Sequence, residues 1–219
     1  MGLGDADPAD HPALSYFRGR YPSRDHWAGS RLFRSGEAAR RSVVRDSLPE
    51  LDGLDVLDVG CGDGVFLSSV VKGKPRLLRL EDLVPEFTQC AHDRMRDQAE
   101  HVEVGVVDSC HTECEKTFDV VLAIGVTDSQ HDWVHFIEEL LRRTTGRLIV
   151  DVPRERDLLN QLRRLWLWLH GIRLQTSSRH GLSRRLESLC QASTIHFTRH
   201  NWILCIDPPP GEQADDGLP

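Results

Sequence analysis

A glycine turn that directly follows a buried strand constrains the fold of this chain most. Leu54–Val59 is an apolar run of strand-forming residues, and Gly60, Gly62 and Gly64 follow it at alternate positions. Missing side chains allow the backbone to turn tightly and to approach a ligand closely. A helix that begins after such a turn points its free amide groups at the ligand. The sequence therefore predicts a strand, a ligand-binding turn and a helix.

The spacing of these glycines differs from that of the dinucleotide-binding fingerprint. The dinucleotide-binding fingerprint GxGxxG needs its third glycine at position 65, where this chain has Val65. The turn reads GxGxG instead, and Asp58 lies two positions before its first glycine. A nicotinamide-dependent dehydrogenase is therefore disfavoured. For Asp58, a turn or helix-dipole contact and a ligand contact both stay open.

Apolar β-branched runs alternate with longer amphipathic stretches, which is the pattern of βαβ units around a parallel sheet. The predicted strands cover 54–59, 76–83, 102–108, 118–125, 146–152, 194–199 and 202–207. Only His200 and Asn201 separate the last two, so we expect a hairpin with an antiparallel final strand. The predicted helices cover 85–100, 131–143, 155–170 and 182–192, and Pro85 suits the start of the first as Gly146 suits the end of the second.

The chain divides into four parts. These are two terminal segments that have few apolar residues to bury, a helical cap and one domain. Residues 1–12 and 208–219 are rich in proline, glycine and acids and have little to bury, so we expect flexible ends. Residues 13–50 form a predicted helical cap broken near Pro22, and residues 51–207 form the ligand-binding domain.

The motif LDVLDVGCGDG resembles that of the class I S-adenosylmethionine-dependent methyltransferases, whose first motif is an acid two positions before a GxGxG turn. Further matches follow in the family's order: Asp82 at the end of the second strand, Val107-Asp108-Ser109 after the third, and FDVV opening the fourth. The resemblance covers residues 51–152. It implies a Rossmann-like methyltransferase fold with a seven-stranded, mostly parallel sheet, an antiparallel C-terminal hairpin strand and helices on both faces. The cofactor that it implies is S-adenosyl-L-methionine.

The resemblance also implies roles for single residues. The acid after the second strand holds the ribose hydroxyls, and Asp82 fits this role, with Glu81 as the competitor. Asp108 and Ser109 lie against the adenine, and Asp58 orients the loop and the methionine amine. The implied cofactor contacts are Asp58, Gly60, Cys61, Gly62, Gly64, Asp82, Leu83, Asp108, Ser109 and Ile124.

Acceptor contacts should come from the loops after the fourth and fifth strands and from the N-terminal cap, because ligands of open parallel sheets bind beyond the carboxyl ends of the strands. The loop IGVTDSQHDW at 124–133 offers Asp128 and His131 as candidate bases. The alternative to a catalytic role is that His131 is a solvated loop residue or caps the following helix. Tyr16 in the cap is the third candidate catalytic residue, although the aromatic residues there are also candidates for the core.

The segment 154–175 combines leucines and tryptophans with arginines and is locally basic in an acidic chain. Its aromatic and cationic side chains suit a cap over an acceptor that is anionic and aromatic or apolar. Two alternatives stay open: an amphipathic helix that packs on the sheet with a solvated basic face, and a peripheral membrane contact.

The composition excludes several other classes. A formal net charge of −7 argues against a dedicated nucleic-acid binder. No signal-peptide pattern and no run of eighteen apolar residues is present, so we expect a cytoplasmic protein without stable membrane insertion. The six cysteines are scattered and should be reduced thiols. We expect no metal, because no second Cys or His pair at zinc spacing accompanies Cys110, His111 and Cys114.

The function that the resemblance implies is methylation of a small-molecule acceptor, a metabolite or natural product, on oxygen or nitrogen by direct in-line transfer. The run from Gly125 to the arginine-rich segment resembles the compact methyltransferases of tetrapyrrole and secondary metabolism. Two alternatives stay open. One is a protein methyltransferase or a non-catalytic partner subunit, and the other is non-methyl chemistry on the same fold. The oligomeric state also stays open, with a homodimer among the alternatives.

Overall fold

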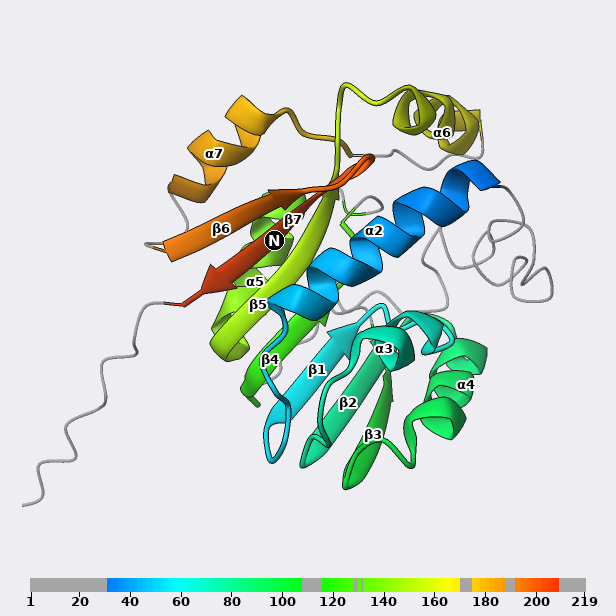
Figure 1. The fold of residues 1–219 in the computed structure, drawn as a ribbon, viewed down its shortest axis with the longest axis vertical. Helices are drawn as coiled ribbons and strands as arrows, with labels where there is room; N and C mark the ends of the chain where they lie inside the picture. The colour runs from blue at the N-terminus through cyan, green and yellow to red at the C-terminus, as the bar shows by residue number, and fades with distance from the viewer. Residues whose placement is uncertain are drawn as a thin grey trace, which may run out of the picture.

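A seven-stranded sheet in the order β3-β2-β1-β4-β5-β7-β6 forms the centre of the molecule (Figure 1). The computed structural model describes residues 31–107, 116–127, 130, 132–169, 175–187 and 192–208. The strands are β1 (Asp55–Val59), β2 (Leu77–Asp82), β3 (His101–Val106), β4 (Phe118–Ala123), β5 (Thr144–Pro153), β6 (Ala192–Phe197) and β7 (Asn201–Asp207). Strands β1 to β5 are parallel, and β7 is antiparallel to both of its neighbours. The predicted sheet and its C-terminal hairpin are confirmed.

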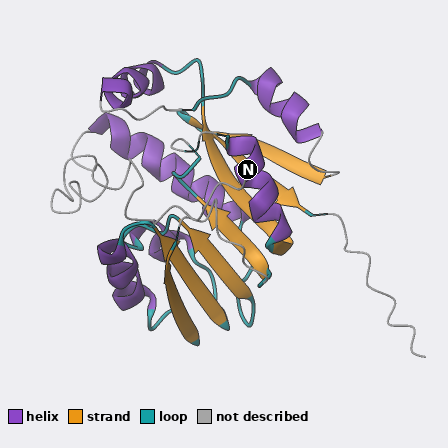
Figure 2. Cartoon of the chain, turned by 180° about the vertical axis from the view of Figure 1, so that it is seen from behind, coloured by secondary structure: helices purple, strands orange, loops and turns teal. Residues whose placement is uncertain are grey.

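Helices cover both faces of this sheet, as the sequence predicts. They are α2 (Arg31–Ser47), α3 (Val65–Val70), α4 (Pro85–Met95), α5 (Trp133–Arg142), α6 (Leu158–Leu169) and α7 (Arg179–Glu187). Helices α2, α3 and α4 bury Val44, Leu67 and Met95 in one core cluster. On the opposite face, seen in Figure 2, α5 and α7 bury Phe136 and Leu182 in a second cluster. Among the α6 side chains that the structure describes, none belongs to either core cluster.

The N-terminus of α5 shows how local sequence places the loop that precedes it. Asp132 caps the helix, because its Oδ1 accepts hydrogen bonds from the backbone N of Val134 at 3.1 Å and of His135 at 3.2 Å. Trp133 and Phe136 then bury the apolar face of the helix. The loop after β4 is thus anchored at its far end by a capped, well-buried helix.

The expected role of Gly146 as the end of α5 is wrong. The helix ends at Arg142, and the Leu140 carbonyl oxygen accepts hydrogen bonds from the Arg143 backbone N at 3.1 Å and from the Thr144 hydroxyl at 2.7 Å, which close the last turn. Gly146 lies inside β5, where an added Cβ would sit 2.5 Å from the carbonyl oxygen of Asp119 on β4. The close contact between β4 and β5 leaves no room for a Cβ at this position, so it requires glycine.

Replacing Gly146 with alanine should therefore destabilise the protein by about 1–3 kcal/mol, because the new methyl group must displace the backbone of β4. Urea unfolding measures the change. Gly181→Ala is the matched control, since Gly181 lies in α7 and its new methyl group would contact only the hydroxyls of Ser177 and Ser178. We expect the control to change stability by less than about 1 kcal/mol. Equal losses for the two variants would contradict this interpretation of Gly146.

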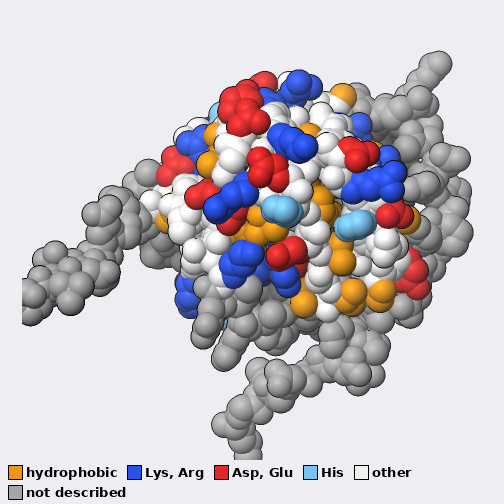
Figure 3. Space-filling model, turned by 90° about the horizontal axis from the view of Figure 1, so that it is seen from below, with side chains coloured by type: hydrophobic (Ala, Val, Ile, Leu, Met, Phe, Trp, Pro, Cys, Tyr) orange, Lys and Arg blue, Asp and Glu red, His pale blue; other side chains and the backbone are white. Residues whose placement is uncertain are grey.

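Much of the surface mixes charges of both signs. The face seen from below intersperses basic, acidic and histidine side chains (Figure 3). Among the described residues, no helix combines the length and the hydropathy needed to cross a bilayer. Within the described ranges, the largest group of exposed apolar side chains lies on α6 and comprises Leu158, Leu162, Leu165, Trp168 and Leu169.

Candidate active site

The glycine turn joins β1 to α3 at the carboxyl edge of the sheet. Gly60, Gly62 and Gly64 have φ angles of 68°, 53° and 75°, in the left-handed region that favours glycine. An added Cβ at Gly60 would lie 2.2 Å from Cγ2 of Val126, in the loop after β4, whereas one at Gly62 would meet nothing within 4 Å. Gly60 is thus needed for packing, and open space adjoins Gly62.

Asp58, on β1 just before this turn, is a buried carboxylate with no hydrogen bond to any residue in the described part of the chain. Only 7% of the residue is exposed. Burial, and after it the charge of Asp82, raises the pKa of Asp58 to about 8. A buried carboxylate without a partner costs free energy unless a donor or a cation reaches it. The position suits a cationic group of a ligand.

Asp82 lies beside the turn at the end of β2. Its Oδ2 accepts a hydrogen bond from the Gly62 backbone N at 2.9 Å, and its Oδ1 accepts one from the Val84 N at 2.9 Å. Burial raises the pKa of Asp82, while these amide donors act in the opposite direction. The two amides fix the orientation of the carboxylate next to the open space at Gly62.

Glu81, the competitor of Asp82, is committed elsewhere. Side chains alternate along a strand, so the two neighbouring acids point to opposite faces of the sheet. The Glu81 carboxylate is 1% exposed and receives two hydrogen bonds from the guanidinium of Arg143, at 2.8 and 3.0 Å, and one from Arg79 at 2.8 Å. Burial alone would raise the pKa of Glu81, but these bonds hold it below its ordinary value. Glu81 is thus part of an internal ion-pair network.

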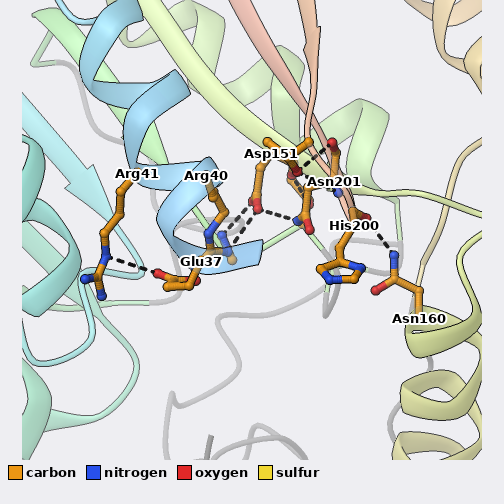
Figure 4. Close-up of polar contacts among 10 residues, drawn as sticks. Glu37, Arg40, Arg41, Asp151, Asn160, His200 and Asn201 are labelled. Atoms are coloured by element: carbon orange, nitrogen blue, oxygen red, sulfur yellow. Dashed lines mark hydrogen bonds and ion pairs between the residues drawn. The ribbon is translucent and has the colours of Figure 1, made fainter. Parts of the chain in front are cut away.

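A second polar network ties α2 to the carboxyl edge of the sheet (Figure 4). Asp151 on β5 is fully buried and accepts hydrogen bonds from Arg40 Nη1 at 3.1 Å, Asn201 Nδ2 at 2.6 Å and the Gly125 backbone N at 2.7 Å. Arg40 also pairs with Glu37 at 2.8 Å. The network holds the cap helix and the loop after β4 in one arrangement. An acid at the carboxyl end of a strand was the available sequence signal for Asp151.

His200 and Asp157 form a pair that sequence reasoning also missed. His200 Nδ1 lies 3.1 Å from Asp157 Oδ2, between the β6–β7 turn and the start of α6. The carbonyl oxygen of His200 accepts a hydrogen bond from Asn160 Nδ2 at 2.7 Å. An added Cβ at Gly36 of α2 would lie 2.4 Å from the imidazole ring. The pair therefore joins α2, α6 and the hairpin, which is a structural role.

Three of the remaining sequence-predicted contacts lie within the described residues, and five predicted residues lie outside them. Leu83 follows Asp82 and is half-buried, Ile124 follows β4 and packs against the core cluster of α2, α3 and α4, and Cys61 is buried in the turn. Burial raises the pKa of the Cys61 thiol. Five predicted residues lie outside the described residues: Tyr16, Asp108, Ser109, Asp128 and His131.

No metal centre is visible in the described ranges, where no group of three His, Cys, Asp or Glu side chains has an arrangement that suits an ion. Cys110, His111 and Cys114 lie outside these ranges.

Comparison with known proteins relates this arrangement to one family. A family model described as a methyltransferase domain matches residues 30–193. No curated protein sequence matches the chain. Among solved structures, magnesium protoporphyrin IX methyltransferase from Synechocystis PCC 6803 with bound S-adenosylhomocysteine is 17% identical, with 90% of this chain and 98% of that chain covered and a TM-score of 0.66. N-methyltransferase NodS from Bradyrhizobium japonicum WM9, also with S-adenosylhomocysteine, is 14% identical, with 90% and 99% covered and a TM-score of 0.66.

Proposed function

Since this chain belongs to the methyltransferase domain family, we propose that it transfers the methyl group of S-adenosylmethionine to a small-molecule acceptor. The observation that carries the proposal is the placement of two acids next to the glycine turn. Asp58 is buried without a hydrogen-bond partner among the described residues, and Asp82 is oriented by amides beside the space at Gly62. A ligand that has both a cationic amine and a ribose matches these groups in charge and in hydrogen bonding.

Each acid has a separate task in this proposal. Asp82 accepts hydrogen bonds from the ribose hydroxyls, and its own bonds to the amides of Gly62 and Val84 keep it in position. Asp58 faces the ammonium group of the methionine moiety, whose positive charge lowers the pKa of the carboxyl group and stabilises its ionised form. Gly62 allows the backbone to approach the ligand closely.

The acceptor side of the site is assigned from the sequence. When bound, the cofactor supplies an activated methyl group on a sulfonium, so the protein mainly has to align the acceptor and exclude water. His131, Asp128 and Tyr16 are proposed to contact the acceptor, and Asp108 with Ser109 to contact the adenine. The Asp151 network supports this side, because it fixes the start of the loop in which Asp128 and His131 lie.

A small-molecule acceptor, methylated on oxygen or nitrogen, fits the proteins of similar fold. One of them is a magnesium protoporphyrin IX methyltransferase, and another is an N-methyltransferase. The arginines and tryptophans of 154–175 favour an acceptor that is anionic and partly apolar. Methylation assays on candidate metabolites, with oxygen and nitrogen nucleophiles tested in parallel, would identify the attacking atom.

Calorimetric titration with S-adenosylhomocysteine tests the cofactor site. Asp82→Asn should weaken binding by about ten- to a hundredfold, because hydrogen bonds to a charged acceptor contribute about 1.5–3 kcal/mol. Asp97→Asn is the matched control, since the Asp97 side chain is 90% exposed at the end of α4 and should leave the affinity unchanged. No binding to the unmodified protein, or equal binding by the two variants, would refute the assignment.

A further inference from the structure

Helix α6 exposes a stripe of four leucines to solvent. Leu158, Leu162, Leu165 and Leu169 follow one another at helical spacing and are 76%, 55%, 57% and 66% exposed. On the opposite side of the helix, Asn160 is only 5% exposed. Its Nδ2 donates to the carbonyl oxygens of His200 and Arg154. Asn160 thus attaches the helix to the protein on the side opposite the exposed leucines.

The segment that contains α6 is strongly basic. Residues 154–200 include nine arginines and three acidic residues, a formal charge of +6, so the rest of this −7 chain has a charge of −13. No acidic residue lies within α6 itself. Arg156, in the turn before α6, and Arg164, within the helix, are both exposed. Exposed cationic side chains therefore accompany the leucine stripe, whereas the face in Figure 3 mixes charges of both signs.

We propose that α6 binds the surface of an anionic lipid bilayer. The leucines and Trp168, which is 63% exposed, enter the interfacial region, and the arginines contact the headgroup phosphates. The helix lies in the plane of the interface, which agrees with the finding that no described helix could cross a bilayer.

The charge distribution favours this occupant over a second copy of the chain. A two-fold contact between leucine faces would bring Arg156 and Arg164 of both copies to one rim, and like charges repel. The negative charge of an anionic bilayer would instead balance the positive charge of these arginines. In Figure 1, α6 lies beside the N-terminal end of α2, and the contacts of His200 connect the two helices. A bound bilayer would therefore adjoin the cap helix of the proposed active site.

Co-sedimentation with lipid vesicles tests the inference without any dependence on methyl transfer. The full-length protein should bind vesicles of equimolar phosphatidylcholine and phosphatidylglycerol at least tenfold more tightly than vesicles of phosphatidylcholine alone. The double variant Leu162→Gln/Leu165→Gln should bind the anionic vesicles at least tenfold more weakly. The double variant Arg156→Gln/Arg164→Gln should lose most of the preference for phosphatidylglycerol.

Val104→Gln/Val106→Gln is the matched control, because these valines are each 42% exposed on β3, at the other edge of the sheet. It should bind anionic vesicles as the unmodified protein does. Thermal melting by circular dichroism verifies that the variants fold. Three outcomes would overturn the proposal: no binding to anionic vesicles, retained binding by the leucine variant, or a dimer in size-exclusion chromatography that the leucine variant alone abolishes.

Discussion

Replacing Arg143 with methionine should lower the free energy of unfolding by about 3 kcal/mol. The substitution removes the two hydrogen bonds that Arg143 donates to Glu81, a carboxylate that is 1% exposed, and retains the ion pair with Arg79. Breaking one side of a buried ion pair typically costs about 3–5 kcal/mol, and the remaining Arg79 favours the low end of that range. Urea unfolding at neutral pH measures the loss.

The loss should shrink in acid. In the unmodified protein the arginines hold the pKa of Glu81 below its ordinary value, so the pair stabilises the fold above that ordinary value. This contribution disappears as the pH falls through the lowered pKa. In the variant, burial favours protonation, so acid removes the uncompensated charge, and the two proteins converge in stability.

Two controls separate the buried pair from a general effect of losing an arginine. The double variant Glu81→Gln/Arg143→Met should recover most of the loss, because no buried charge remains. Arg76→Met breaks a pair with Asp55 in which the arginine side chain is 61% exposed, and it should cost far less stability than Arg143→Met, because solvent screens an exposed pair. A double variant as unstable as Arg143→Met alone would show that the charge at Glu81 is not the cause.

Replacing Asp58 with asparagine should have opposite effects on cofactor binding and on stability. Binding of S-adenosylhomocysteine should weaken by about thirtyfold or more, since loss of one member of a buried charge pair costs about 2–5 kcal/mol. The free protein should gain about 1–3 kcal/mol at pH 8, because a buried, unpaired carboxylate is removed. Calorimetry and urea unfolding on the same samples measure the two changes.

The pH dependence follows from the raised pKa of Asp58. The folded protein keeps the carboxyl protonated up to a pKa of about 8, whereas the unfolded chain releases the proton near 3.8. Between these values the folded state binds the extra proton, so stability from this group falls as the pH rises. The advantage of Asp58→Asn should therefore widen from pH 4 to pH 8 and then level off.

Proton release gives an independent measurement of the same group. At pH 7, binding of a cationic amine should ionise Asp58, so titrations in two buffers of different ionisation enthalpy should reveal a released proton. Asp58→Asn should release none from this position. If the variant binds as tightly as the unmodified protein, Asp58 does not contact the cofactor, although the gain in stability would persist.

The sequence predicted the features that depend on neighbouring residues. A strand followed by GxGxG is a local pattern, and the three left-handed glycines and the parallel strands around them agree with it. The short connection between the last two strands likewise predicted the antiparallel hairpin. The position of Asp82 beside the turn follows from the shared carboxyl edge of parallel strands.

Features that join distant segments were decided by the tertiary structure. Gly146 was assigned to a helix end from its neighbours, but its contact with Asp119 exists only because β4 and β5 are adjacent. The sequence alone left Glu81 and Asp82 as competitors, and the fold separates them by bringing Arg143, 62 positions away, onto Glu81.

The orientation of α6 has the same explanation. Its sequence is that of an amphipathic helix, and packing of such a helix on the sheet was one expectation. Four of its leucines are exposed, and the hydrogen bonds of Asn160 with the His200 and Arg154 carbonyl oxygens attach the opposite side of the helix. A periodic pattern determines that a helix has two unlike faces. Which face meets the protein depends on partners that come from other parts of the chain.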